Sequence, residues 1–220
     1  MDNIRENIAK INEKKPDNVL LVAVTKTRTA EEINRAIDCG ITDIGENKVQ
    51  EILEKYEYVK PVRWHMIGHL QTNKVKYIID KVSLIHSVDS LKLAKEINKR
   101  AANKGLTMDI LIQVNVAEED SKYGIKVEET EPLIKEILNN FEHIRVRGLM
   151  TIAPFEENPE NVRKYFRQLK SLFDSLATIK HERLDFKYLS MGMTNDYEVA
   201  IEEGSNLIRI GTAIFGERNY

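Results

Sequence analysis

Short apolar runs alternate with amphipathic segments along the whole chain. The first run, residues 19–24, is unbroken, as expected for a strand that is buried on both faces. Thr29 follows as an N-cap, with Glu32 three residues later as its capping-box partner, and Gly40 marks the end of the amphipathic segment. This pattern predicts a buried strand followed by a helix.

The same unit of strand and helix recurs to the end of the chain. Apolar runs predict seven further strands, at residues 42–45, 63–67, 82–86, 108–116, 144–150, 186–189 and 207–210. Helical periodicity predicts the helices between them, at residues 48–58, 75–79, 90–103, 127–138, 159–176 and 196–203. An extra N-terminal helix is predicted by the spacing of Ile4, Ile8 and Ile11.

Strict alternation of strands and helices predicts parallel strands with right-handed crossovers. Eight such units in 220 residues fit an α/β fold of the single (β/α)8 TIM-type barrel class. No Gly/Ser-rich or low-complexity linker divides the chain, so we expect one domain over residues 1–220. An open doubly wound sheet, which needs fewer strands, is the alternative architecture.

Composition narrows the class of partner. The chain has 33 basic and 35 acidic residues, so its net charge of −2 provides no field that would gather nucleic acid. Its one cysteine, Cys39, excludes an intrachain disulfide. The first 15 residues lack a signal-peptide core and no run of 18 apolar residues occurs, so we expect a cytoplasmic protein that does not span a membrane.

Polar residues follow the predicted strands, where (β/α)8 barrels carry their active sites. Lys26 ends the first apolar strand. An amine that is partly desolvated there can react as a neutral nucleophile and form a Schiff base. An ordinary lysine at the barrel rim fits the same position, and position alone favours that simpler interpretation.

Two glycine-containing turns follow the seventh and eighth strands, at residues 190–194 and 209–213. Backbone N–H groups in such turns can approach an anion closely, and this is the common phosphate site of (β/α)8 barrels. Tight turns that merely use glycine are the alternative. Arg209 lies inside the last strand and needs a partner, either an acid such as Glu46 or the ring nitrogen of a bound heterocycle.

A metal site is not expected. His65 and His69 are four residues apart, but they straddle a strand end and Gly68, which is not the same-face helical pair of a metalloprotease. Hydrogen-bonded structural roles are the better interpretation of both histidines.

Six segments, in order along the chain, carry a specific combination of motifs. They are residues 22–26 (VAVTK), 43–47 (DIGEN), 64–74 (WHMIGHLQTNK), 147–150 (RGLM), 189–193 (LSMGM) and 209–216 (RIGTAIFG). Together they resemble the YggS/PROSC family of pyridoxal phosphate homeostasis proteins, over essentially the whole chain.

The resemblance implies a cofactor and the residues that hold it. It implies the barrel of the alanine racemase N-terminal domain, with pyridoxal 5′-phosphate (PLP) bound through a Schiff base on Lys26. By the motif match, Arg209 would face the pyridine nitrogen of the cofactor. The phosphate would be held by Ser190, Gly192, Met193, Gly211 and Thr212, and the pocket would be lined by Asn47 and Met150.

The resemblance also bears on catalysis. A permanently charged arginine at the pyridine nitrogen disfavours ring protonation and weakens the ring as an electron sink. Related racemases take a second acid/base, a tyrosine, from a C-terminal β domain of the partner subunit. We expect that domain to be absent here, because the sequence ends at Tyr220, and spacing does not place Tyr123, Tyr197 or His69 as substitutes.

We therefore predict a carrier and regulator of intracellular PLP supply, with no catalytic residues, as a monomer whose recipients would be PLP-dependent apo-enzymes. Two enzymatic alternatives remain: a racemase-like PLP enzyme with an unknown amino-acid substrate, and a Schiff-base aldolase acting on sugar phosphates. A pure interaction module explains the lysine and the phosphate turns least well. Lys122 could act as a secondary lysine in cofactor transfer, although a solvated loop lysine is the simpler interpretation.

Overall fold

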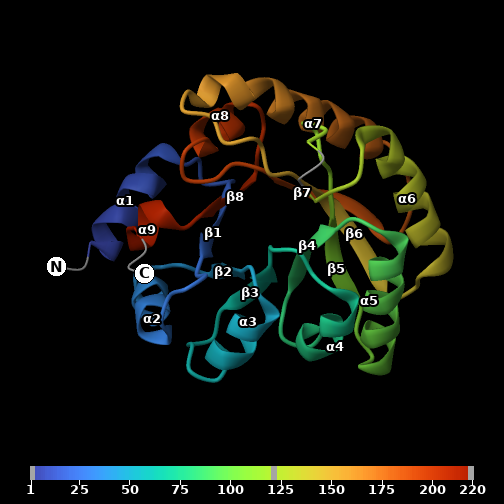
Figure 1. The fold of residues 1–220 in the computed structure, drawn as a ribbon, viewed down its shortest axis with the longest axis horizontal. Coiled ribbons are helices and arrows are strands. Elements are labelled where there is room, and N and C mark those ends of the chain that lie inside the picture. The colour runs from blue at the N-terminus through green and yellow to red at the C-terminus, as the bar shows by residue number, and fades with distance from the viewer. Residues whose placement is uncertain (1–2, 120–122, 218–220) are drawn as a thin grey trace.

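The strands close into a barrel. The computed structural model describes residues 3–119 and 123–217. Eight parallel strands form one closed sheet in chain order, so the predicted TIM-type α/β fold is confirmed (Figure 1). The strands are β1 (Leu20–Val24), β2 (Asp43–Glu46), β3 (Arg63–Met66), β4 (Leu84–Val88), β5 (Met108–Gln113), β6 (Ile144–Met150), β7 (Leu184–Ser190) and β8 (Leu207–Ile210).

Helices surround the barrel on its outside (Figure 1). They are α1 (Ile4–Lys14), α2 (Ala30–Asp38), α3 (Val49–Lys55), α4 (Val75–Ile78), α5 (Leu91–Asn103), α6 (Val127–Asn140), α7 (Arg163–Leu176), α8 (Tyr197–Glu202) and α9 (Thr212–Phe215), with 3-10 turns η1 (Thr72–Lys74) and η2 (Pro159–Val162). Within the described part of the chain, none of these helices combines the length and the apolar character needed to cross a membrane.

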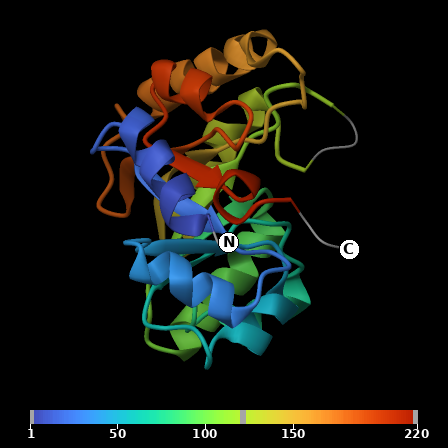
Figure 2. The ribbon, with the colours of Figure 1, turned by 90° about the vertical axis from the view of Figure 1, so that its left-hand side faces the viewer.

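Local signals in the sequence act as expected at the first helix after β1. The Thr29 hydroxyl accepts a hydrogen bond of 3.2 Å from the Glu32 N–H, and the Glu32 carboxylate accepts one of 2.8 Å from the Thr29 N–H. The predicted capping box of α2 is therefore confirmed. The predicted N-terminal helix is also present as α1, which lies against α9 (Figure 2). Asn7 of α1 donates to the carbonyl oxygen of Ile214 at 3.0 Å.

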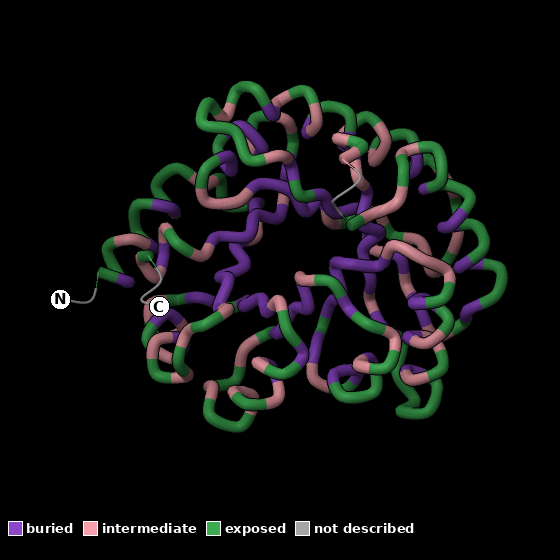
Figure 3. Tube along the Cα trace, viewed as in Figure 1, coloured by how far each residue is buried: buried purple, intermediate pink, exposed green. Residues whose placement is uncertain are grey.

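Two apolar layers hold the barrel together. The larger one lies between the sheet and the helices, and its members are buried while the outer faces of the helices are exposed (Figure 3). The smaller one consists of Val22, Leu84, Leu111, Met150 and Leu207. These side chains share the barrel interior with the polar residues described below.

The fourth strand differs most from its prediction. We expected it at residues 82–86, but β4 spans Leu84–Val88. Val82 is apolar and buried, yet its N–H donates to the carbonyl oxygen of Ile78, so it closes the turn after α4. Strand pairing begins only where Leu84 meets His65 of β3.

Candidate functional site

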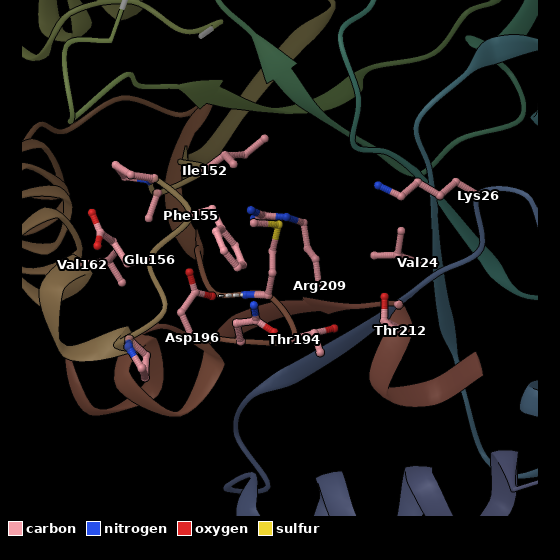
Figure 4. Close-up of a pocket in the computed structure, with 16 residues that line it drawn as sticks. Val24, Lys26, Ile152, Phe155, Glu156, Val162, Thr194, Asp196, Arg209 and Thr212 are labelled. Carbon is pink, nitrogen blue, oxygen red and sulfur yellow. Dashed lines mark hydrogen bonds between the residues drawn. The ribbon is translucent and has the colours of Figure 1, made fainter. Parts of the chain in front are cut away.

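A cavity of about 540 Å³ opens at the carboxyl ends of β1, β6, β7 and β8 (Figure 4). That size is typical of small-molecule sites, which run to roughly 300–1,000 Å³. Its lining residues are Val24, Lys26, Ile152, Ala153, Pro154, Phe155, Glu156, Pro159, Val162, Met193, Thr194, Asn195, Asp196, Arg209, Gly211 and Thr212. Lys26 and Arg209 enter it from neighbouring strands, β1 and β8.

Lys26 lies two residues after Val24, the buried last residue of β1, and is itself half-buried. Its side chain extends from the β1 end into the cavity, with the amine on the side of Arg209 (Figure 4). Thr27, the next residue, has a positive φ of 64°, which is uncommon outside glycine. The backbone therefore turns sharply away immediately after Lys26.

Lys55 of α3 holds the backbone on one side of Lys26, and Glu51 holds it on the other. The Lys55 ammonium donates to the Thr25 carbonyl oxygen at 2.9 Å, to Glu46 at 2.7 Å and to Glu51 at 2.8 Å. Glu51 in turn accepts a hydrogen bond of 2.6 Å from the Thr27 N–H. Both chain neighbours of Lys26 are thus bonded into one ionic network, which fixes the point from which its side chain starts.

Glu46 is a buried member of this network. Burial raises the pKa of its carboxyl, and the nearby Lys55 ammonium opposes that rise. Its Oε1 atom also accepts a hydrogen bond of 2.7 Å from the Thr25 hydroxyl. The interpretation of Glu46 as the partner of Arg209 is wrong: Glu46 pairs with Lys55, an ion pair on the outer side of β1 and β2.

The turn after β7 requires glycine at one position. Gly192 has φ +95°, and a Cβ atom there would lie 2.6 Å from the Ala200 Cβ. The Met193 N–H donates to the Asp196 carboxylate at 2.6 Å (Figure 4). Burial raises the pKa of Asp196, while the Met193 N–H and the Arg209 charge oppose this rise.

The turn after β8 leads into α9. The backbone N–H of Thr212 belongs to the first turn of that helix, where N–H groups lack an intrahelical acceptor. Among the hydrogen bonds of the described residues, none engages the N–H of Thr194 or of Thr212. Two backbone donors from different turns therefore border the same cavity and are available to an anion.

Arg209 is buried, with only 3% of its surface exposed. Its guanidinium donates to the Ser190 hydroxyl at 2.5 Å and to the Thr151 carbonyl oxygen at 2.8 Å. Burial lowers the pKa of Arg209 to about 10, and the Asp196 charge opposes that shift. The group therefore remains a cation at neutral pH, at one wall of the cavity.

The structure separates the predicted cofactor-binding residues into two groups. Lys26, Met193, Arg209, Gly211 and Thr212 line the cavity. The others lie outside its lining: Asn47, Met150, Ser190 and Gly192.

Each residue outside the lining has an identifiable environment. Met150 is fully buried in the inner apolar layer, below the cavity. The Ser190 hydroxyl is hydrogen-bonded to Arg209 and to His86. Gly192 lies within the turn after β7 and packs closely against Ala200. The Oδ1 atom of Asn47 is buried without a hydrogen-bond donor among the described residues.

The loop between β6 and η2 supplies cavity residues that the sequence did not single out. Ile152 and Phe155 are exposed by 39% and 78% and form an apolar wall beside the two glycine turns (Figure 4). The signal that could have identified these two residues is that apolar residues continue beyond the end of the sixth strand, at Ile152 and Phe155. Asp196 was also missed, although it lies only four residues after Gly192, just beyond the glycine turn at residues 190–194.

The histidines and tyrosines considered earlier lie elsewhere. His65 is hydrogen-bonded in the barrel interior, as expected, and the His69 ring stacks on Tyr123 with centroids 4.0 Å apart. Tyr197 packs into the core under α8. Over residues 3–119 and 123–217, no group of three or more His, Cys, Asp or Glu side chains could hold a metal ion. Lys122 lies outside the described residues.

Comparison with known proteins gives a consistent picture. Residues 1–219 match the family described as alanine racemase, N-terminal domain. The pyridoxal phosphate homeostasis protein of Aquifex aeolicus (strain VF5) is 48% identical over 202 residues, which cover 91% of this chain and 87% of that protein.

Two solved structures share the fold. PipY of Synechococcus elongatus PCC7942, solved with PLP bound, has a TM-score of 0.87 at 30% identity. The match covers 97% of this chain and 100% of the PipY chain. Alanine racemase of Clostridium difficile 630 has a TM-score of 0.73 at 15% identity, over 99% of this chain and 57% of that one. The second comparison concerns the fold alone.

Proposed function

The chain belongs to the alanine racemase N-terminal domain family, among its pyridoxal phosphate homeostasis proteins, and on this premise we propose that it binds PLP and acts in PLP homeostasis. The observation that carries the proposal is the meeting of Lys26, Arg209 and two glycine turns at one cavity (Figure 4). These groups match, in kind and number, the aldehyde, the ring nitrogen and the phosphate of the cofactor.

The donor set fits a phosphorylated heterocycle. The backbone N–H groups of Thr194 and Thr212 suit a phosphate, and Gly211 keeps the turn after β8 free of a side chain there. The apolar wall of Ile152 and Phe155 suits the face of an aromatic ring. Arg209 brings a cation to the cavity wall, which suits a ring nitrogen that accepts a hydrogen bond.

Lys26 would hold the cofactor covalently. PLP supplies an electrophilic aldehyde when bound. The neutral amine of Lys26 would add to the aldehyde carbon, the carbonyl oxygen would leave as water, and a C=N bond would replace the C=O bond. No electrons are exchanged, so the reaction needs no further reactant and is reversed by water or by another amine. A reactive aldehyde would thus be stored and released without being consumed.

Arg209 favours storage over catalysis. A guanidinium that keeps its charge disfavours a proton on the adjacent ring nitrogen, and an unprotonated ring withdraws electrons weakly. Besides Lys26 and Arg209, the titratable side chains lining the cavity are Glu156 and Asp196. We therefore propose a non-catalytic carrier that works in the cytoplasm as a monomer and donates to PLP-dependent apo-enzymes.

Titration of the purified protein with PLP tests this function. We expect saturable binding with a new visible absorbance band in the wild type, and loss of that band in Lys26→Ala. Lys10→Ala, an exposed lysine of α1, is the matched control and should behave as the wild type.

A screen of amino acids with the loaded protein then separates a carrier from an enzyme. A carrier shows at most trace turnover and transfers PLP to an apo-enzyme. Sustained turnover that is lost in Lys26→Ala would instead identify a PLP-dependent enzyme, and absence of PLP binding would refute the proposal altogether.

A further inference from the structure

A line of buried hydrogen bonds starts at the cavity and crosses the barrel interior. The Arg209 guanidinium lies 2.5 Å from the Ser190 hydroxyl, which lies 3.1 Å from His86 Nδ1. His86 Nε2 lies 2.9 Å from His65 Nδ1. The His86–Ser190 contact joins β4 to β7, on different sides of the barrel, and the three polar side chains Ser190, His86 and His65 are at most 3% exposed.

The same line continues to the opposite end of the barrel. His65 Nε2 lies 2.9 Å from the carboxylate of Asp43, the first residue of β2. Arg63 donates two hydrogen bonds to that carboxylate, of 2.8 and 2.7 Å. The Arg63 side chain is 57% exposed and borders a second cavity, of about 380 Å³, at the amino ends of the strands. One chain of contacts therefore connects the two ends of the barrel.

The acceptors at the far end determine which group donates at every step. Hydrogen bonds from His65, Arg63 and Thr42 outweigh burial and lower the pKa of Asp43 to about 2, so Asp43 is a carboxylate that only accepts. His65 must then donate from Nε2. When its Nδ1 carries no proton, that nitrogen accepts from His86 Nε2–H.

The same logic runs through His86 to the cavity. Burial, together with the charge of Arg209, lowers the pKa of His86 well below its usual value, so this ring is neutral. With its proton on Nε2, His86 accepts at Nδ1, and among the described residues its donor there is the Ser190 hydroxyl. The Ser190 oxygen is then free to accept from Arg209. Every donor in the line points from the cavity toward Asp43.

We propose that Ser190 and His86 are positioning residues, which hold the Arg209 guanidinium toward the cofactor through a one-directional hydrogen-bond chain that ends at Asp43. The connection to the cofactor rests on the function proposed above, whereas the direction of the chain is a property of the protein alone. The chain also changes the role expected of Ser190. Its single hydroxyl proton is donated to His86, so Ser190 would orient Arg209 and would not donate to the phosphate.

The opposite arrangement has a different signature. If His65 were protonated, it would donate to His86 from Nδ1, and His86 would carry its proton on Nδ1. Ser190 would then accept from both His86 and Arg209, and its hydroxyl proton would have no acceptor in the chain. The tautomers of the two histidines therefore report the direction directly.

Nitrogen-15 NMR of the protein labelled at histidine, without PLP, tests the direction. The His65→Phe and His86→Phe variants assign the nitrogen resonances to the two rings. If either variant fails to fold, the wild-type spectrum still gives the number of histidine rings that are neutral with the proton on Nε2. We expect both His65 and His86 to be neutral with the proton on Nε2 at neutral pH. A charged His65, or a proton on Nδ1 of either ring, would overturn the proposal.

Ser190→Ala tests the link to Arg209, with Ser87→Ala as a matched control. Ser87 is also buried, on β4 next to His86, and its hydroxyl has no hydrogen-bond partner among the described residues. We expect Ser190→Ala to shift the His86 Nδ1 resonance, to weaken PLP binding about tenfold and to move the absorbance maximum of bound PLP. Ser87→Ala should change none of these, and equal behaviour of the two variants would contradict the positioning role.

The two proposals fail separately. If the wild type binds no PLP, the proposed function is refuted, while the histidine spectra still decide the direction of the chain. If PLP binds and the tautomers are opposite to those expected, the function stands and the hydrogen-bond chain is wrong.

Discussion

Lys55 donates a hydrogen bond of 2.9 Å to the carbonyl oxygen of Thr25, the residue directly before Lys26. The same ammonium neutralises Glu46, whose side chain is completely buried. The group that fixes the backbone of the proposed cofactor lysine is thus also the group that makes a buried carboxylate tolerable. Stability and site geometry therefore depend on one side chain outside the barrel.

Replacing this side chain should be costly. Lys55→Met keeps the length of the stem but leaves the Glu46 charge buried and unpaired, so we expect a loss of about 3–5 kcal/mol in the free energy of unfolding. Denaturant unfolding measures it. Lys60→Met is the control, because Lys60 and Asp38 form an exposed pair, worth at most about 1 kcal/mol. Equal losses in the two variants would show that the Lys55 network is not what stabilises this end of β1.

Asp43 should govern part of the acid stability. Its pKa of about 2 in the folded protein lies below the unfolded value of about 3.9. A lowered pKa stabilises the folded state above the unfolded pKa, and this contribution disappears as the pH falls from about 4 to 2. The shift corresponds to roughly 2–3 kcal/mol.

Unfolding of Asp43→Asn as a function of pH tests this contribution. The difference in stability between the wild type and the variant should be largest above pH ~4 and should shrink toward pH ~2. Asp38→Asn, at an exposed carboxylate, provides the comparison. A difference that stays constant with pH would mean that Asp43 is not held ionised by His65 and Arg63.

Gly192 should be irreplaceable for a steric reason as well as for its backbone angle. Gly192→Ala would place a Cβ atom 2.6 Å from the Ala200 Cβ, at φ +95°. Gly40→Ala has nearly the same angle, φ +97°, but nothing within 4 Å of the new Cβ. Gly40→Ala should therefore cost about 1 kcal/mol, and Gly192→Ala about 1–3 kcal/mol more.

Binding completes this comparison. Because the displaced turn borders the cavity, affinity for PLP should fall at least tenfold in Gly192→Ala and remain unchanged in Gly40→Ala. Thermal unfolding and PLP titration give the two readouts. A Gly192→Ala protein with wild-type stability and affinity would show that the turn after β7 tolerates a side chain.

Asp196 should shape the same turn through its hydrogen bond to the Met193 N–H. Asp196→Ala removes the acceptor and should cost about 1–3 kcal/mol, whereas Asp196→Asn keeps an oxygen in place and should cost less. Amide hydrogen exchange at Met193 checks this directly: protection should fall in Asp196→Ala and persist in Asp196→Asn. The same loss of protection in both would assign the effect to the charge of Asp196, not to the hydrogen bond.

The parts of the molecule that could be predicted from the sequence are those determined by local pattern. Apolar runs identified the strands, and Thr29 with Glu32 identified the start of α2. The strand ends also placed Lys26 at the cavity, because in parallel barrels all carboxyl ends meet at one face. Val82 misled the prediction of β4, because an apolar side chain can be buried by a turn as well as by a strand.

The partners of buried polar groups could not be predicted in this way. Ser190 and His86 are separated by 104 positions in the sequence, so only closure of the barrel brings them together. The sequence predicted that Arg209 needs a partner, but it offered Glu46 or a bound heterocycle and did not single out Ser190, to which the guanidinium donates. A useful signal was present in β4, where His86 stands in a strand that is buried throughout and so had to find a partner inside.

The central claim, that Lys26 carries PLP, is tested most directly by borohydride reduction of the PLP-loaded protein, followed by peptide mass mapping. Reduction converts the C=N bond to a stable amine and so marks the lysine that formed it. We predict a phosphopyridoxyl adduct on the peptide that contains Lys26 and its absence in Lys26→Ala. An adduct confined to other lysines, or none at all after loading, would contradict the account.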